Sequence, residues 1–383
     1  MIDSVFILGN HIQALGLARL AKKTNLKVSL FNDNRASIAR YSNSCQHFYL
    51  FHDKEHLLQL LRIHAGTKNT LLLATNDSLI DFLSINFQEL NQLYYLSIPE
   101  PGIVDICYNK RLTYQKAMEL GIPIPESFFP DSMDDILQLV DQINYPVILK
   151  PAVMYNFHKI TGKKVILCND KESLIRNYRK IITIIPPNEV IVQEFLTGGA
   201  KVLYSFGSFA ANGKVFSSLS ANRTRQNPMD FGNSTCYAIT VSEPVFEELA
   251  IKFLRGIDYF GMSEVEFMKN DETSTYKMLE INPRAWKWHS IANRLDINFL
   301  KEMVDYLDQK ELNPKHNELI GIGWIERVTD LYICFKEIMH KRMKVKDYFR
   351  SLKITKESAV WSLNDPLPAI MYLTLFPYLF TKR

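Results

Sequence analysis

Three polar residues occupy alternate positions in the segment YKMLEINPRAWKWH, residues 276–289. If this segment is a strand, Glu280, Asn282 and Arg284 project from one face, because side chains two positions apart share a face. An acid, an amide and a base in one row do not suit an apolar core. The pattern therefore predicts that a polar ligand lies over this face.

A second alternating segment, MSEVEFMKN (262–270), precedes the first, and the turn-like DETST separates them. The two segments are predicted to form a hairpin. A symmetric turn gives three cross-strand pairs: Glu264 with Asn282, Glu266 with Glu280, and Met268 with Met278. The same register predicts one apolar face, which consists of Val265, Phe267, Leu279 and Ile281. A slip of one residue would move every side chain to the other face.

The facing acids Glu266 and Glu280 need a physical reason, because like charges directly opposite destabilise a sheet. A bound divalent cation supplies one, since Mg²⁺ takes carboxylate oxygens together with the phosphates of a substrate. The alternative is a hairpin whose polar face is simply solvated. These two segments alone leave both interpretations open.

Composition limits the class of protein. The chain has 383 residues, 47% of them hydrophobic, which predicts a globular protein of two or three domains. A net charge of +4, without basic repeats flanked by aromatic residues, argues against nucleic acid as a partner. The five cysteines show no C-x-x-C spacing, which indicates no disulfide framework or zinc site and favours a cytoplasmic location. The first residues lack the basic region of a secretory signal.

The first hundred residues alternate apolar strands with amphipathic helices, beginning with SVFILGN and HIQALGLARLAKKTN. This alternation predicts an α/β layer. Gly9 and Gly16 do not have the G-x-G-x-x-G spacing, which argues against an oxidoreductase with a dinucleotide bound there. The segment PEPGIVD (99–105) breaks the pattern and predicts a domain boundary.

Lys150 ends the apolar segment INYPVILKP, where a lysine is costly unless its ammonium enters a polar site. The alternative is that Lys150 extends to bulk water. A further hydrophobic strand, EVIVQEFLTGG (189–199), runs into Gln193 and Glu194 and stops at a double glycine.

Six segments in this order resemble the ATP-grasp superfamily, and more narrowly its carboxylate–amine ligases, including the D-aspartate ligase-like members. They are NKRLTYQKAMELGIPIP, YPVILKP, VIVQEFLTGG, RTRQNP, GMSEVEFMKND and MLEINPRAW. The last of these and WSLNDPLPAIMYL (361–373) are similar to a group associated with cell-surface polymers. The resemblance covers most of the chain.

The resemblance implies an ATP-grasp fold, α/β overall and α+β in the ligase core. It implies a Rossmann-like domain at 1–105, an ATP-grasp domain at 106–315 with a lid at about 123–192, and a helical extension at 316–383. It also implies roles for individual residues. Lys110 and Lys150 would reach the phosphates of ATP, Gln193, Glu194, Phe195 and Leu196 would border the adenine, and Met268 would lie under the ring. Glu266, Glu280 and Asn282 would bind Mg²⁺ or Mn²⁺, and Arg284 and Arg225 would contact the reacting phosphate or carboxylate.

The implied reaction forms an amide from a carboxylate and an amine through an acyl phosphate, with ADP and phosphate as products. The substrates would be small molecules, such as an amino acid or a cell-envelope precursor, and a homodimer is one expected assembly. The alternative is an ATP-binding ATP-grasp protein that senses or scaffolds without catalysis. For Arg225 and Arg284, a surface salt bridge is the competing interpretation.

Two departures from the superfamily pattern concern the nucleotide. The segment after Lys150 has one glycine, Gly162, and no serine, where a glycine- and serine-rich loop is usual. His158, Lys159, Lys163 or Lys164 would then contact the phosphates instead. The acid expected to hold the ribose is also missing, because Ala200 and Lys201 occupy its place.

The end of the chain predicts either a closing element or a membrane contact. Residues 336–356 are rich in bases interleaved with apolar side chains, and the apolar run 369–380 is too short to span a bilayer. One interpretation packs this run on the ligase core. The other places it in a membrane interface at the inner face, where bases beside apolar residues suit anionic lipids.

Overall fold

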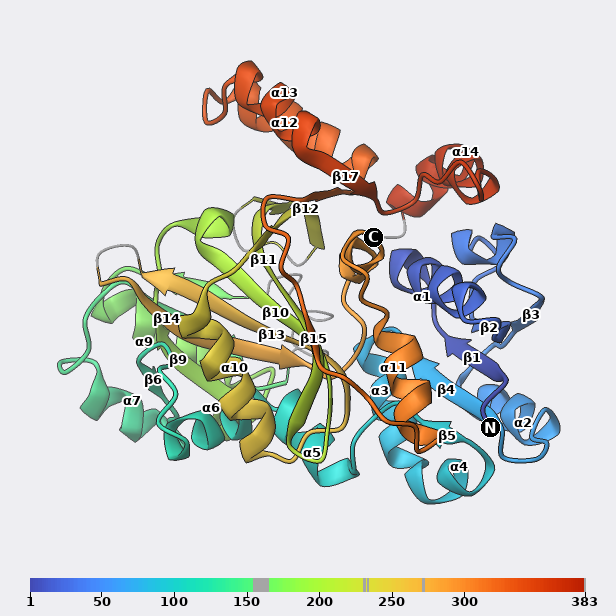
Figure 1. Ribbon diagram of the computed structural model, residues 1–383. Helices are drawn as coiled ribbons and strands as arrows, with labels where there is room; N and C mark the ends of the chain where they lie inside the picture. The colour runs from blue at the N-terminus through green and yellow to red at the C-terminus, as the bar shows by residue number, and fades with distance from the viewer. Residues whose placement is uncertain (154–164, 230–231, 233, 271–272, 382–383) are drawn as a thin grey trace.

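The computed structural model describes residues 1–153, 165–229, 232, 234–270 and 273–381. Within these ranges the chain forms a mixed α/β fold of three sheets (Figure 1). The N-terminal sheet lies at one end of the molecule, and the large sheet occupies its middle. This arrangement confirms the predicted α/β class.

The N-terminal sheet is parallel, with the strand order β3-β2-β1-β4-β5. Its strands are β1 (Ser4–Leu8), β2 (Lys27–Asn32), β3 (His47–Leu50), β4 (Thr70–Ala74) and β5 (Tyr95–Leu96). Its helices are α1 (His11–Lys23), α2 (Lys54–Ile63), α3 (Asp77–Ile85) and α4 (Phe87–Leu93). Parallel strands joined by helices form a Rossmann-like layer, as the sequence predicted.

The large sheet has eight strands in the order β14-β13-β10-β11-β12-β16-β17, with β15 beside β11. These strands are β10 (Leu203–Ala211), β11 (Lys214–Asn227), β12 (Ser234–Val241), β13 (Gly261–Asn270), β14 (Thr275–Asn282), β15 (Lys315–His316), β16 (Gly323–Ile325) and β17 (Thr355–Ser358). Two helices, α10 (Pro244–Gly256) and α11 (Phe299–Leu307), contact β10 and β11.

The small sheet has the order β6-β9-β7-β8 and a core of its own. It consists of β6 (Ser127–Phe128), β7 (Val147–Pro151), β8 (Ile166–Cys168) and β9 (Val190–Glu194), with α7 (Met133–Leu139) and α9 (Lys171–Ile181) packed beside it. These elements fall in and just beyond the segment predicted as a lid.

Two helices connect the N-terminal sheet to the small sheet. The first, α5 (Pro101–Tyr108), crosses the predicted boundary at residue 105, because Pro101 is well suited to the first turn of a helix. The second, α6 (Lys110–Glu119), ends before Gly121, whose φ of 64° suits glycine. The division into domains therefore remains a proposal.

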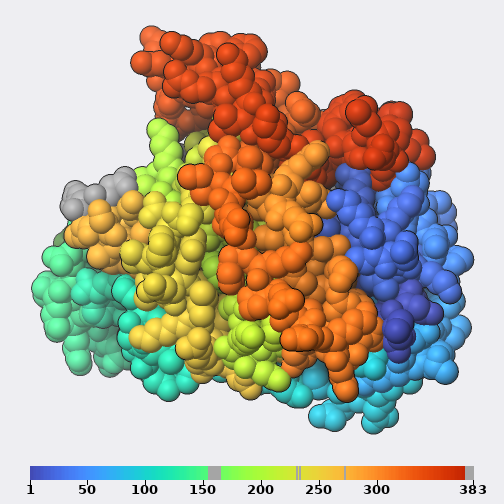
Figure 2. Space-filling view, viewed as in Figure 1, coloured from blue at the N-terminus to red at the C-terminus, as the bar shows by residue number. Residues whose placement is uncertain are grey.

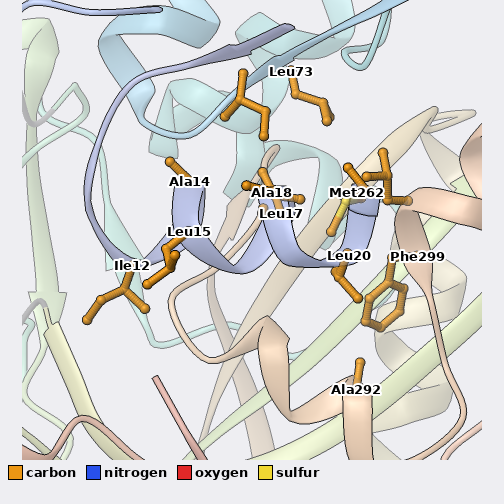
Figure 3. Packing of buried hydrophobic residues seen from close by; sticks show 14 of the residues in the cluster. Ile12, Ala14, Leu15, Leu17, Ala18, Leu20, Leu73, Met262, Ala292 and Phe299 are labelled. Atoms are coloured by element: carbon orange, nitrogen blue, oxygen red, sulfur yellow. The ribbon is translucent and has the colours of Figure 1, made fainter. Parts of the chain in front are cut away.

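A shared apolar core joins the N-terminal layer to the large sheet. Along α1, Leu15, Leu17 and Leu20 are buried in one cluster with Met262 and Phe299 (Figure 3). At Gly16 the two parts approach so closely that a Cβ atom would lie 2.5 Å from Nε2 of His289. This glycine thus serves packing between the two parts.

The predicted C-terminal extension is only partly separate from the core. Its strands β16 and β17 belong to the large sheet, and α12 (Arg327–Met339) and α13 (Val345–Ile354) project from it as a hairpin (Figures 1 and 2). The last helix, α14 (Leu367–Thr381), lies beside the N-terminal layer near α1.

Two buried carboxylates fix this extension to the rest of the chain. Asp365 accepts hydrogen bonds from Arg19 Nε (2.9 Å), Ser42 Oγ (2.7 Å) and the Asn43 amide (2.9 Å). Asp330, on α12, pairs with an arginine of β11 that is described below. The extension is thereby tied to both neighbouring parts.

Ala369 and Tyr372, on α14, are buried in the same core as α1. This packing agrees with the interpretation of the tail as a closing element. No helix within the described residues has both the length and the apolar character needed to cross a membrane.

Candidate active site

The hairpin of β13 and β14 has the predicted register at its acidic end. Glu264 pairs with Asn282 and Glu266 with Glu280, but the register then shifts between Glu266 and Phe267. The predicted pairing of Met268 with Met278 is wrong, since Met268 lies opposite Lys277. The shift also turns Leu279 away from the core, and Tyr276 and Met278 are buried there with Val265, Phe267 and Ile281.

Two buried acids of β13 contact the guanidinium of Arg223, on β11. Its Nη1 lies 2.5 Å from Glu266 Oε1 and 3.5 Å from Glu264 Oε1. The amide of Asn282 donates to Glu266 Oε1 at 3.0 Å, and Trp288 Nε1 donates to Glu264 at 2.8 Å. Glu264 and Glu266 are therefore held in place by one cation and two neutral donors, which come from three segments.

Burial raises the pKa of Glu266 to about 7, and Arg223 opposes this effect while Glu280 and Glu264 reinforce it. Removing charge from water is unfavourable, and neighbouring carboxylates add repulsion. Arg223 thus offsets burial and the repulsion between the acids only in part, and added positive charge would favour the ionised form of Glu266.

Two lysines approach the same face from different elements. Lys110, at the start of α6, donates to Glu280 Oε2. Burial lowers the pKa of Lys110, but Glu280 and Tyr114 outweigh this effect and raise it. Lys150, at the end of β7, donates to the Tyr114 hydroxyl at 2.6 Å. Burial and the charge of Lys110 hold the pKa of Lys150 well below its usual value of 10.5.

The donor set fits a divalent cation by its chemistry. Glu266, Glu280 and Asn282 offer carboxylate and amide oxygens, which hard cations prefer. No group of three or more His, Cys, Asp or Glu side chains in the described parts of the chain is arranged to hold a metal. Asn282 currently turns its NH₂ group toward the acids, so its oxygen would reach a cation only after the amide flips.

A cavity of about 970 Å³, here called the first cavity, lies over one end of this face. Its floor is an apolar cluster formed by Met268, Leu203, Leu196 and Leu279. Lys110, Lys150, Glu266 and Glu280 line it as well, together with Gln193, Glu194 and Phe195 of the strand β9 and the turn that follows it. The cavity thus has an apolar end and a charged end.

The chain after β9 offers backbone groups to the first cavity. The amides of Glu194 and Phe195 donate to the carbonyls of Glu126 (2.9 Å) and Pro146 (3.2 Å). The Leu196 amide makes no hydrogen bond to any residue in the described ranges. The side chains of Gln193 and Glu194 are bonded to Ser127 Oγ and Lys277. A ligand at this position would therefore be recognised by backbone groups and not by the side chains of Gln193 and Glu194.

A second cavity of about 940 Å³ lies on the other side of the acids. Residues 10–13 of the N-terminal layer line it, together with Asp77, Arg284, Lys287 and Tyr372. Five residues line both cavities: Lys110, Arg223, Gly232, Glu266 and Glu280. The two cavities therefore meet at the acidic face.

Arg284 lies at the edge of the second cavity, as its place in the row predicted. Its Nε lies 2.5 Å from Asp77 Oδ1, and its Nη2 donates to Asn282 Oδ1 at 3.2 Å. Because Asp77 begins α3, this contact links the N-terminal layer to the acidic face. Asp77 is half exposed, so a ligand could displace this pairing.

A family model described as the ATP-binding domain of the carbamoyl-phosphate synthase large chain matches residues 109–299. This range contains Lys110, Lys150, Arg223, Glu266, Glu280 and Arg284. This chain is an ATP-grasp protein.

Two curated relatives show how far the likeness of this ATP-grasp chain extends. It is 24% identical over 189 residues to the mitochondrial arginine-specific large chain of carbamoyl phosphate synthase from Schizosaccharomyces pombe. It is 24% identical over 191 residues to the C-terminal section of that large chain from Methanopyrus kandleri. These matches cover 47% and 49% of this chain but only 15% and 34% of the relatives.

Solved structures extend the likeness beyond the matched range. The biotin carboxylase domain of Hydrogenobacter thermophilus 2-oxoglutarate carboxylase, in complex with MgADP, ADP and bicarbonate, has a TM-score of 0.66 and 14% identity over 84% of this chain and 73% of its own. Staphylococcus aureus N5-carboxyaminoimidazole synthetase with ADP has a TM-score of 0.65 and 16% identity over 88% and 86%. At these identities the shared property is the ATP-grasp fold.

The role of Arg225 as a clamp for substrate stays a prediction, because Arg225 lines the first cavity but its guanidinium is already paired within the protein. Its Nε and Nη2 lie 2.6 and 2.9 Å from the two oxygens of Asp330, and its guanidinium stacks 3.8 Å from the Tyr237 ring centroid. Both groups of the pair are buried. Arg225 therefore fastens α12 to the sheet.

Arg223 was missed by the sequence interpretation, although it stands two positions before Arg225. The pairing of β11 with β12 is irregular between Asn222 and Gln226, which gives the two arginines different surroundings. The only sequence signal was the alternation in RTR, which does not say which arginine faces the acids.

Of the two segments that depart from the superfamily pattern near the nucleotide, the structure describes only the one that contains Ala200 and Lys201. The proposed phosphate contacts of His158, Lys159, Lys163 and Lys164 lie outside the described residues. Ala200 and Lys201 line the first cavity, as do Lys341 and Lys344 from the turn between α12 and α13. The basic segment predicted to face a membrane thus contributes to the rim of the first cavity.

Proposed function

We propose that this ATP-grasp protein is an ATP-dependent ligase that joins a carboxylate to an amine through an acyl phosphate. The observation that carries the proposal is the meeting of two cavities at Lys110, Arg223, Glu266 and Glu280. A nucleotide in the first cavity would present its last phosphate to a carboxylate in the second. Positioning of this kind accounts for much of phosphoryl-transfer catalysis.

In this proposal the adenine lies on Met268 and borders the backbone at Glu194 and Leu196. Lys110 and Lys150 bind the phosphates, and Glu266, Glu280 and Asn282 hold Mg²⁺ or Mn²⁺. When bound, such a cation neutralises phosphate charge. The solved relatives described with ADP or MgADP support this placement.

The reaction needs no nucleophile from the protein. A carboxylate oxygen of the substrate attacks the γ-phosphorus of ATP, and the bond from that phosphorus to the oxygen of ADP breaks. The amine then attacks the acyl carbon, the carbon–oxygen bond to phosphate breaks, and the nitrogen loses a proton. Arg223 and Arg284 would stabilise the charge on the transferred phosphoryl group and on the acyl phosphate.

The finer expectations from the sequence stay part of this proposal. They are a D-aspartate ligase-like reaction on an amino acid or a cell-envelope precursor, a homodimer, and a cytoplasmic location. All five cysteines are free, which fits a reducing compartment. Peripheral contact of the basic hairpin with the inner face of a membrane is tested by co-sedimentation with anionic vesicles at low salt.

A substrate screen tests the proposal directly. Purified protein is incubated with ATP, Mg²⁺ and pools of carboxylates and amines, and ADP, phosphate and product mass are followed. We expect one pair of pools to release ADP and phosphate in equal amounts with formation of an amide. Nucleotide binding without stimulated release from any pool would favour the sensor or scaffold.

A further inference from the structure

Three exposed lysines line the first cavity, and they are here called the rim lysines: Lys201, Lys341 and Lys344. Lys201 belongs to a short helical turn, Gly199–Val202, that follows β9. The other two belong to the turn between α12 and α13. None of the three ammonium groups has an ion-pair partner in the part of the chain that the structure describes.

The acids of the first cavity, by contrast, are each paired with a base. Glu266 pairs with Arg223, and Glu280 pairs with Lys110. The other acids of the described lining pair in the same way: Glu194 with Lys277, Glu337 with Arg342, and Asp347 with Arg350. The positive charge of the rim lysines is therefore not matched by an acid of the described lining.

Buried or half-buried contacts fix both helices that flank the turn of the extension. Asp330 of α12 pairs with Arg225 of β11, which also lines the cavity. The Tyr237 hydroxyl of β12 donates to the Ser351 carbonyl of α13 at 2.7 Å. The large sheet therefore sets the position of this turn at the rim of the cavity.

Lys201 is held beside the same sheet. Its carbonyl accepts a hydrogen bond from the side-chain amide of Asn222, on β11, at 2.9 Å. Thr224 and Gln226, further along β11, line the first cavity. The rim lysines thus come from two segments that are far apart in the sequence and that are both attached to β11.

The backbone of Lys341 adds a second observation. Its φ is 59°, in the left-handed region, where glycine or asparagine costs less than lysine. Its amide donates to the Ile338 carbonyl at 2.9 Å, so it closes the end of α12. The turn itself therefore gives no reason for a lysine at this position.

A nucleoside diphosphate or triphosphate would bring several negative charges into this cavity. Lys110 and Arg223 are each already paired with an acid, so they add little net positive charge. The rim lysines are cations without such a partner. A cavity lined by unmatched charge of one sign attracts ligands of the opposite sign.

We propose that Lys201, Lys341 and Lys344 form a phosphate subsite at the rim of the first cavity. This inference rests on the proposed ligase function and deepens it, since it gives the C-terminal extension a role in ligand binding. The phosphate belongs either to the nucleotide itself or to a second phosphorylated ligand beside it. Lysine suits both, because its ammonium is a point charge on a flexible stem.

Calorimetry on the full chain tests the subsite and separates the two sources of phosphate. The probes are MgADP, adenosine as the same nucleoside without phosphate, and pyrophosphate added to protein saturated with MgADP. The variant Lys201→Met/Lys341→Met/Lys344→Met removes the three charges.

Two results would support the subsite. If the rim lysines bind the nucleotide, the triple variant should weaken ADP about five- to tenfold at low salt and leave adenosine within about twofold. If they bind a second ligand, ADP affinity should stay the same and pyrophosphate binding should be lost. Either loss should shrink at high salt, because exposed charges are screened.

Two further variants control for net charge and for folding. Lys214→Met/Lys252→Met/Lys353→Met removes three exposed lysines that do not line the cavity, and it should bind like the parent. Lys341→Gly removes one rim lysine from a left-handed position. It should unfold at no lower temperature than the parent and still weaken the same probe about two- to threefold.

The remaining outcomes would overturn the subsite. They are unchanged affinity for both ADP and pyrophosphate in the rim variant, an equal loss in the control variant, a loss for adenosine as large as that for ADP, and a parent that binds neither phosphate probe. The ligase proposal fails separately. Absence of substrate-stimulated ADP release from the parent with every pool would overturn it, even where the phosphate probes bind as expected.

Discussion

The two cavities differ in how the chain builds them. The first cavity is formed largely by strands and turns whose own sequences are distinctive, such as the end of β9 and the hairpin of β13 and β14. The second is assembled from the start of α1, the start of α3, the loop after β14 and the distant helix α14. A local pattern can therefore reveal one cavity, while only the fold reveals the other.

Glu266 and Glu280 line both cavities. A change at this acidic face should therefore have the largest effect on turnover and little effect on nucleotide binding. We expect Glu280→Gln to lower substrate-stimulated ADP release about a thousandfold, since the amide keeps the shape and loses the charge. Metal-free ADP affinity, measured by calorimetry, should change less than about twofold. Glu248→Gln, an exposed change on α10, is the control. Turnover near that of the parent would remove Glu280 from the site.

Substitutions of Arg223 and Arg225 test whether two nearby positions on β11 have different roles, one in the site and one in attaching α12. Arg225→Met leaves buried Asp330 unpaired and should lower the free energy of unfolding by about 3 kcal/mol in urea titrations. Arg223→Met should instead lower turnover about a hundredfold in protein that remains folded. The assignment is wrong if Arg225→Met unfolds like the parent and Arg223→Met turns over normally.

Lys150 tests the charged end of the first cavity through a proton. Its pKa lies well below 10.5 without ligand, and phosphate should raise it toward that value. At a pH between the pKa of Lys150 in the free protein and its pKa with ATP bound, Lys150 should therefore take up a proton when ATP binds. Calorimetry in buffers of different ionisation enthalpy detects this uptake. Lys150→Met should abolish the uptake and weaken ATP about tenfold, and exposed Lys214→Met should do neither. Unchanged proton uptake in Lys150→Met would show that a different group takes up the proton.

Met268 tests the apolar end of the first cavity and should have the smallest effect. Met268→Ala should weaken ADP about two- to fivefold by fluorescence titration, because a flat ring loses part of its floor. Met339→Ala, on the exposed side of α12, is the matched control. Equal ADP affinity in both variants would place the adenine away from Met268.

The acidic end of the site could be predicted because Glu266 and Glu280 stand in regular alternation on either side of one turn. The prediction failed at Met278 and Leu279, where an irregularity shifts the register in a way that spacing does not encode. The parallel N-terminal layer was predicted from apolar runs, but β3 (His47–Leu50) was not among the predicted strands; it is a short edge strand whose side chains are exposed or only half-buried.

The contacts of Arg225 and Lys287 could not be predicted for a different reason. Their acid partners, Asp330 and Glu326, lie 105 and 39 positions away in a segment that the ATP-grasp resemblance did not explain. Tertiary contacts between distant segments leave no periodic signal in either segment. The role of the extension in the second cavity is thus a property of the fold.

The fastening of the extension at Asp330 and Asp365 has a consequence for substrate traffic. Since one carboxylate is bound to the large sheet and the other to the N-terminal layer, the extension spans both like a strap. Moving the large sheet away from the N-terminal layer would widen the second cavity, but it would also break the buried hydrogen bonds of Asp330 or of Asp365. Neither carboxylate contacts the small sheet, whose strands β7 and β9 border the first cavity. We therefore expect a widening of the first cavity on that side to leave the hydrogen bonds of Asp330 and Asp365 intact.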